Sequence, residues 1–131
     1  MNPVHHIELW TNDLVASEPA WHWLLSALGW EREVVPGWPS GRNWHHPSGV
    51  YMVLEQSPAV VGDRHERMAP GLNHLAFRVT DRAALDVLRA DAGTHGWGEL
   101  FADRYPHAGG TAHTALYLEN AEGFEVEIVA P

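Results

Sequence analysis

The chain has 131 residues, of which 45% are hydrophobic, and a formal net charge of −9 at pH 7. This is the composition of one soluble globular domain. It contains no cysteine, which excludes disulfides and thiolate metal sites, and the acidic balance makes nucleic acid an unexpected partner. No apolar run approaches the roughly 18 residues that span a bilayer, and the N-terminus lacks a signal-peptide layout. We therefore expect a cytoplasmic protein with no membrane partner.

The first half of the chain predicts a strand, a helix and three further strands. Residues 4–10 alternate as a strand, and Ser17-Glu18-Pro19 then predicts a helix start with the serine hydroxyl as N-cap. Apolar side chains recur at helical spacing until Gly29, which predicts the helix end. The three expected strands span residues 30–35, 42–45 and 50–55.

The second half repeats this order. Residues 72–79 predict a strand, and Asp81 predicts the cap of a helix that ends near residues 93–96. Later strands are expected over residues 97–102, 113–119 and 124–129. The interval 57–71 is rich in turn residues and predicts a linker. The sequence thus indicates one domain made of two βαβββ modules, at about residues 1–56 and 72–131.

The first strands of the two halves resemble each other. A shift of 68 residues places His6 on His74, and the flanking apolar and acidic residues also match. In the second copy Leu75 and Phe77 point towards a core, whereas His74 and its face-mates point the other way. Two copies of one strand with a histidine at the same place suggest a duplicated module with a site between its halves.

The last strand of each half carries a glutamate, Glu55 in the first and Glu127 in the second. We expect these residues to be equivalent, as are His6 and His74. Two imidazoles and two carboxylates suit a divalent metal such as Ni²⁺, Zn²⁺, Mn²⁺ or Fe²⁺. A carboxylate could also act as a base, so Glu127 and Glu55 are the catalytic candidates.

Weaker candidates for substrate contacts are aromatic or polar side chains expected on the same faces or in nearby loops. These are Trp10, Trp44, Tyr51, Arg78, Tyr105, His107 and, less prominently, His113. Each has a structural alternative. Arg78, for example, could form an ion pair with Glu8.

The chain resembles the vicinal oxygen chelate superfamily, which includes glyoxalase I, extradiol dioxygenases, fosfomycin-resistance thiol transferases and bleomycin-resistance binding proteins. The resemblance covers essentially the whole chain. It is carried by the paired halves, His6-Ile7-Glu8-Leu9, Asn73-His74-Leu75-Ala76-Phe77 and Gly123-Phe124-Glu125-Val126-Glu127-Ile128. The usual Asp-Pro-x-Gly-Asn turn is replaced by residues 119–124, which keep Gly123 four places before Glu127.

This resemblance implies an α+β fold in which two tandem βαβββ modules form a curved mixed sheet around a cavity. It implies one divalent metal ion, with His6, Glu55, His74 and Glu127 as its ligands. It also implies a small-molecule substrate that chelates the metal through vicinal oxygens. Small members of the superfamily pair as dimers, so we expect a homodimer in which His6 of one chain joins His74 of the other.

Four functions remain open within the superfamily. The four-ligand set favours a metal-dependent lyase or isomerase resembling glyoxalase I. An Fe²⁺ dioxygenase would use His6, His74 and Glu127 alone, so the discriminating feature is whether Glu55 reaches the metal. A thiol transferase on an epoxide phosphonate needs more cations than the sequence offers. The last alternative is a non-enzymatic protein that binds an aromatic antibiotic, and failure to bind a divalent metal would indicate it.

Overall fold

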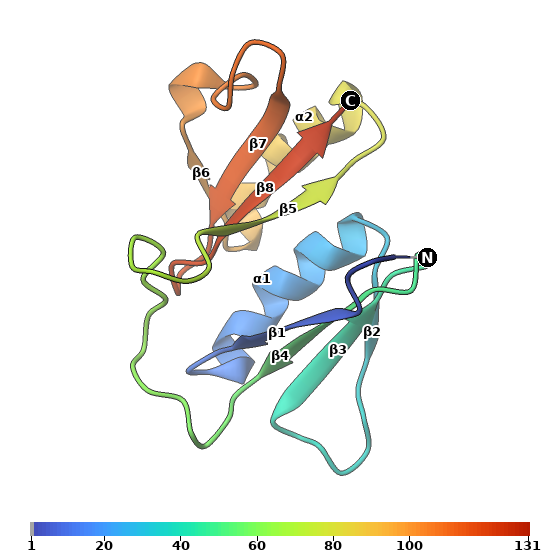
Figure 1. Ribbon diagram of the computed structural model, residues 1–131, viewed down its shortest axis with the longest axis vertical. Coiled ribbons are helices and arrows are strands. Elements are labelled where there is room, and N and C mark those ends of the chain that lie inside the picture. Colours follow the sequence, from blue (N-terminus) through green and yellow to red (C-terminus); the bar gives the residue numbers. More distant parts are fainter. Residues whose placement is uncertain (1) are drawn as a thin grey trace. The chain divides into compact units, whose positions relative to one another are not determined.

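The computed structural model describes residues 2–131, and these form two compact units that divide between Arg64 and His65. This boundary lies within the interval 57–71 that predicts a linker. Each unit is an α+β module with one four-stranded mixed sheet (Figure 1). The predicted fold class is therefore confirmed, and the two units are described separately.

The first unit contains one long helix and four strands. In chain order they are β1 (His6–Trp10), α1 (Leu14–Ala27), β2 (Glu31–Glu33), β3 (Gly41–His45) and β4 (Tyr51–Glu55). The strand order is β1-β4-β3-β2, and β1 runs parallel to β4 while the other neighbours are antiparallel. The parallel pair needs a crossover connection, and α1 begins that connection.

One face of this sheet packs against α1 and the other is open. Because side chains alternate along a strand, the positions Leu9, Met52 and Leu54 share the helix-facing side. Trp44 of β3 lies on the same side. The buried residues Trp21, Leu24 and Leu25 of α1 complete this core. Burying each such side chain contributes roughly 1.5–3 kcal/mol to the stability of the fold. The apolar face is therefore held against the helix, and a site can form only on the opposite face of the sheet.

The start of α1 differs from the prediction. The helix begins at Leu14, and the side chain of Asp13, not that of Ser17, caps it by accepting a hydrogen bond from the Ala16 N–H at 3.1 Å. Ser17 is buried inside the helix, where its hydroxyl lies 2.9 Å from that of Thr11. The prediction of Ser17 as N-cap was therefore wrong, because two good capping residues stand four places apart and the earlier one caps the helix.

The second unit repeats the plan with two added 3₁₀ turns. Its elements are β5 (His74–Arg78), α2 (Arg82–Asp91), η1 (Ala92–His95), β6 (Gly98–Leu100), η2 (Ala102–Arg104), β7 (Thr114–Glu119) and β8 (Glu125–Ala130). The strand order is β5-β8-β7-β6, with β5 parallel to β8. Asp81 caps α2 as predicted, accepting from the Ala84 N–H at 2.8 Å.

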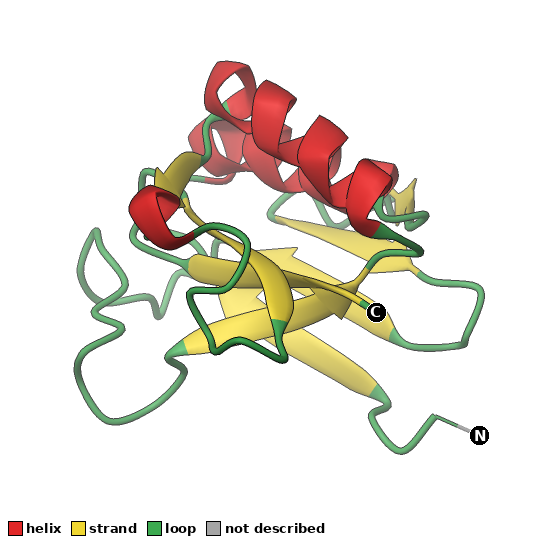
Figure 2. Ribbon diagram, turned by 90° about the horizontal axis from the view of Figure 1, so that it is seen from above, coloured by secondary structure: helices red, strands yellow, loops and turns green. Residues whose placement is uncertain are grey.

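Helix α2 contacts β7 and β8 and so covers one face of the second sheet. Figure 2 shows helices in red and strands in yellow. Leu85 and Leu88 of α2 are buried where the helix contacts β7 and β8. The apolar side chains on the helix-facing side of these strands include Leu116, Val126 and Ile128. The opposite face carries polar side chains. Among the helices described over residues 2–131, none has the length and apolarity needed to cross a membrane.

Candidate active site

Glu127 on β8 lies at the centre of a polar cluster on the open face of the second sheet. The residue is only 6% exposed. Its Oε2 lies 3.2 Å from Nε2 of His74, and its Oε1 lies 2.5 Å from Nε2 of His113. The phenol of Tyr117 donates a hydrogen bond to the same Oε1 at 2.8 Å. Two imidazoles and one phenol thus surround one buried carboxylate.

The sheet register explains this convergence. Glu127 is paired with Ala76 on β5 and with Tyr117 on β7, so all three share one face. The small Ala76 side chain leaves room for His74, which lies two residues earlier on β5 and on the same face, to reach Glu127 diagonally. His113 precedes β7 and has the same alternation as Tyr117, so its ring meets the carboxylate from the other side.

Ionisation of this cluster depends on two opposing effects. Burial acts to raise the pKa of Glu127, but the hydrogen bonds from His113 and Tyr117 and the nearby imidazoles outweigh it and hold that pKa below its usual value. Burial, followed by the hydrogen bond to Glu127, raises the pKa of Tyr117 to about 12. At neutral pH the site therefore presents an ionised carboxylate and a protonated phenol.

An arginine next to this cluster neutralises two further carboxylates. Arg67, with a side chain 17% exposed, lies 3.0 Å from Glu119 and 3.3 Å from Glu125. Glu125 is the face-mate of Glu127 two residues earlier on β8 and pairs with His74. The ion pairs with Arg67 therefore leave Glu127 as the carboxylate that faces the two imidazoles.

The first unit arranges its predicted residues differently. His6 pairs in register with Tyr51, and their rings stack with centroids 4.8 Å apart. The Nδ1 atoms of His5 and His6 lie 2.8 Å apart. Glu55 lies at the other end of β4, where its Oε2 accepts a hydrogen bond from the indole N–H of Trp38 at 3.1 Å.

The glutamates of the two sheets therefore lie at different ladder positions, two residues apart when each is counted from its strand histidine. Two residues beyond His74, the partner on β8 is Glu127, but two residues beyond His6 the partner on β4 is Val53. Glu55 lies a further two residues along. Four residues of strand amount to roughly 13 Å, so the first sheet does not bring Glu55 to His6 as the second brings Glu127 to His74.

The metal that the resemblance implies can be tested against these contacts. His74 and Glu127 are donor types that divalent ions take, and Nε2 of His74 lies 3.2 Å from Oε2 of Glu127. Within residues 2–131, however, no group of three or more His, Asp or Glu side chains is arranged to hold a metal ion. The structure thus offers a two-ligand arrangement in the second unit and no complete site among the described residues.

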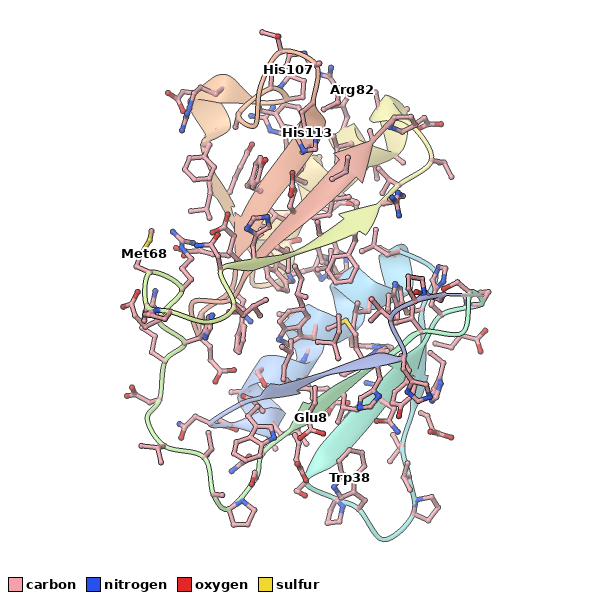
Figure 3. All side chains as sticks on the ribbon, viewed as in Figure 1. Glu8, Trp38, Met68, Arg82, His107 and His113 are labelled. Atoms are coloured by element: carbon pink, nitrogen blue, oxygen red, sulfur yellow. The ribbon has the colours of Figure 1, made fainter. Side chains whose placement is uncertain are left out.

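The predicted substrate contacts fall into separate places. Trp44 is 1% exposed and lies in the core, where its indole donates to His22. Tyr105 donates to Asp86 on α2, on the far side of the second sheet from Glu127. His107 lies beside His113, with its Nδ1 3.1 Å from the His113 carbonyl oxygen (Figure 3).

Three predicted contacts do lie on open sheet faces. Trp10 and Tyr51 share the open face of the first sheet, and Arg78 is exposed on the open face of the second. The expected partner of Arg78, Glu8, accepts a hydrogen bond within its own unit from the indole of Trp10 at 2.6 Å.

Two residues that contact the predicted carboxylates were not among the candidates. Tyr117 contacts Glu127, and the alternation of His113, Ala115 and Tyr117 could have indicated their common face. Trp38 contacts Glu55 from a proline- and glycine-rich turn, where no periodic signal exists.

The comparisons with known proteins agree with this architecture. The family model described as "Glyoxalase/Bleomycin resistance protein/Dioxygenase superfamily" matches residues 5–117. The uncharacterized protein YqjT of Bacillus subtilis is 34% identical over 128 residues, which cover 98% of each chain.

Two solved structures extend the comparison. A candidate glyoxalase from Bacillus halodurans is 35% identical, with a TM-score of 0.90 over 100% of this chain and 97% of that one. The fosfomycin resistance protein FosX of Listeria monocytogenes shares the fold, with 14% identity and a TM-score of 0.63 over 98% of this chain and 90% of that one. A mutant of that protein was solved with Mn(II) and 1S,2S-dihydroxypropylphosphonic acid. The family match and the relatives at 34% and 35% identity lead to one conclusion: this chain belongs to the glyoxalase/bleomycin resistance protein/dioxygenase superfamily.

Proposed function

We propose that the protein is a divalent-metal-dependent lyase or isomerase that acts on a small molecule with two neighbouring oxygen atoms. The observation that carries this proposal is the buried Glu127 carboxylate, contacted by His74 on one oxygen and by His113 and Tyr117 on the other. A bound divalent ion would supply Lewis-acid polarisation of the substrate oxygens. His74 and Glu127 would be its ligands in the second unit, and His6 stays the predicted ligand of the first. Glu55 is left out of the proposed set, because it lies four residues along β4 from Tyr51, the register partner of His6.

The chain's own proton chemistry is assigned to His113 and Glu127. The His113 side chain is 40% exposed, whereas the carboxylate behind it is 8% exposed. A buried carboxylate that contacts an accessible imidazole fixes the orientation of its ring, and imidazole is the side chain best suited to move protons near neutral pH. In this proposal His113 takes the proton from the substrate carbon. Tyr117 keeps the carboxylate in place through its hydrogen bond.

The proposal is tested by solvent exchange. Protein freed of metal with a chelator and then loaded with Ni²⁺, Mn²⁺, Zn²⁺ or Fe²⁺ is incubated in D₂O with a panel of α-hydroxy and α-keto compounds. We expect ion-dependent deuterium incorporation next to the carbonyl group, which Glu127→Gln abolishes. The matched control is Glu33→Gln on β2, a carboxylate with hydrogen bonds only in the first unit. Exchange that is independent of the ion or unchanged in Glu127→Gln would contradict the proposal.

A second candidate, an Fe²⁺ dioxygenase, is favoured by Val53. Because Val53 is the ladder counterpart of Glu127, the first sheet supplies a histidine without a matching carboxylate. A set of two histidines and one carboxylate is the one that iron oxygenases use. Oxygen consumption by the Fe²⁺-loaded protein in the presence of catechols, without deuterium exchange in the panel above, would select this candidate. The proposed small-molecule substrate and homodimer are tested by the same panel and by analytical ultracentrifugation.

A further inference from the structure

We infer that the open face of the first sheet is a binding site for an organic cation, held by Glu55 and Glu8 and by the indoles of Trp10 and Trp38. The inference deepens the proposed function by naming a charged group of the substrate. Only the identification of the bound cation as a substrate rests on that function. Its test needs no metal and no turnover.

Two indoles flank Glu55 on this face. Trp10 is the register partner of Glu55 on β1, and Gly41 is its partner on β3. A Cβ atom at Gly41 would overlap the Trp38 ring, so this ring covers the glycine and takes the place of a side chain. Since neighbouring strands are about 4.8 Å apart, the two indoles stand on either side of the Glu55 strand.

Each indole also orients a carboxylate. The N–H of Trp10 donates to Oε2 of Glu8 at 2.6 Å, and that of Trp38 donates to Oε2 of Glu55 at 3.1 Å. Within residues 2–131 no hydrogen bond uses the other oxygen of either carboxylate. Figure 3 labels Glu8 and Trp38 on this part of the first unit. Trp10 is 42% exposed, a large value for an indole.

The charge of this face selects the ligand. Glu8, Glu31, Glu33 and Glu55 all have the alternation of the open face, and no position of strands β1–β4 on that face is an arginine. The arginines of these strands, Arg32 and Arg42, are on the other face and pair with Glu18 of α1 at 3.0 Å each. His45, on the same face, lies 3.2 Å from Glu33. Glu8 and Glu55 have no histidine or arginine partner of this kind among residues 2–131, and their hydrogen bonds come from indoles.

Indoles next to carboxylates favour an ammonium group that carries carbon atoms over a bare metal ion. The ring faces attract the positive charge and contact the methyl groups, while the carboxylate oxygens supply the opposite charge. The net charge of −9 adds long-range attraction for a cationic ligand. A neutral molecule of the same shape would gain the ring contacts only.

The experiment compares choline with its neutral isostere 3,3-dimethylbutan-1-ol. Each is titrated into the ¹⁵N-labelled, metal-free full chain, and the indole N–H resonances of Trp10 and Trp38 report binding. We expect choline to bind at least about tenfold more tightly than the alcohol. Glu55→Gln and Trp38→Leu should each weaken choline binding roughly three- to tenfold. Glu33→Gln, a control on the same face, should change it less than twofold, and the spectrum of each variant verifies its fold.

Three results would overturn the inference: equal affinity for choline and the alcohol, equal effects of Glu55→Gln and Glu33→Gln, or no choline-dependent shift of the two indole resonances at any soluble concentration. The proposed function fails separately. Choline binding without ion-dependent deuterium exchange would leave this site intact and reject only that function, and exchange without choline binding would do the reverse.

Discussion

Val53 of the first sheet occupies the ladder position that Glu127 occupies in the second. Each lies beside the residue two places after the strand histidine, Glu8 after His6 in one sheet and Ala76 after His74 in the other. The duplicated modules thus keep their histidines in step but not their glutamates. This two-residue offset explains why Glu127 meets an imidazole while Glu55 meets the indole of Trp38.

The contact between Trp38 and Gly41 predicts a large cost for a small substitution. Gly41→Ala would put a Cβ atom inside the van der Waals envelope of the Trp38 ring and displace that ring from the sheet. Overpacking of this kind lowers the free energy of unfolding by about 1–3 kcal/mol. Urea unfolding measures the change. Gly93→Ala is the matched control, because a Cβ atom there would meet nothing within 4 Å. Equal stabilities of the two variants would contradict the placement of Trp38.

The two helix caps should contribute similarly to stability. Asp13 and Asp81 each accept a hydrogen bond from the backbone N–H three residues ahead. Replacing either by alanine should lower the free energy of unfolding by about 1 kcal/mol. Asp91→Ala serves as the control, because that side chain makes no cap hydrogen bond to η1. No loss in Asp13→Ala would argue against the helix start at Leu14.

The lowered pKa of Glu127 predicts a loss of stability in acid. A carboxyl group with a depressed pKa in the folded state stabilises that state above its ordinary pKa of about 4.3, and the contribution is lost as the pH falls through the lowered value. Urea midpoints measured between pH 7 and pH 3 should therefore fall less steeply in Glu127→Gln than in the wild type. Equal slopes would contradict the ionised, hydrogen-bonded state of Glu127.

Removal of one hydrogen-bond donor tests the cause of that shift. Tyr117→Phe takes away the phenol that donates to Oε1 at 2.8 Å. We expect the pKa of Glu127 to rise towards its ordinary value, as followed by ¹³C NMR of the carboxyl carbon. Tyr105→Phe is the control, since that phenol donates to Asp86 and should leave the pKa of Glu127 unchanged.

His113 should be needed for turnover but not for metal binding. Loss of a general base lowers the rate about 10²- to 10⁴-fold, so His113→Gln should slow deuterium exchange by this order while the affinity for the ion changes little. The comparison of exchange rates with calorimetric metal affinity separates the two roles. His107→Gln, which changes the neighbouring loop imidazole, should keep most of the exchange activity.

Much of the fold follows from alternation and capping. The period of two in residues 4–10 and 72–79 predicted on which face of its own sheet each strand histidine lies, His6 in the first and His74 in the second. Asp81 predicted the start of α2. The offset between Glu55 and Glu127 could not be predicted, because a shift of two residues keeps a side chain on the same face and moves it only along the strand. Tyr105 and Trp38 lie in loops, where no periodic pattern indicates direction.

The most direct test of the account is the affinity for Mn²⁺ of three forms of the protein: the wild type, Glu127→Gln and Glu55→Gln. Calorimetry is performed on untagged protein, since added histidines would bind the ion. We predict one ion per chain, an affinity reduced more than tenfold by Glu127→Gln, and a change of less than twofold in Glu55→Gln. No ion bound by the wild type, or an affinity that depends on Glu55 and not on Glu127, would contradict the assignment of the metal to His74 and Glu127.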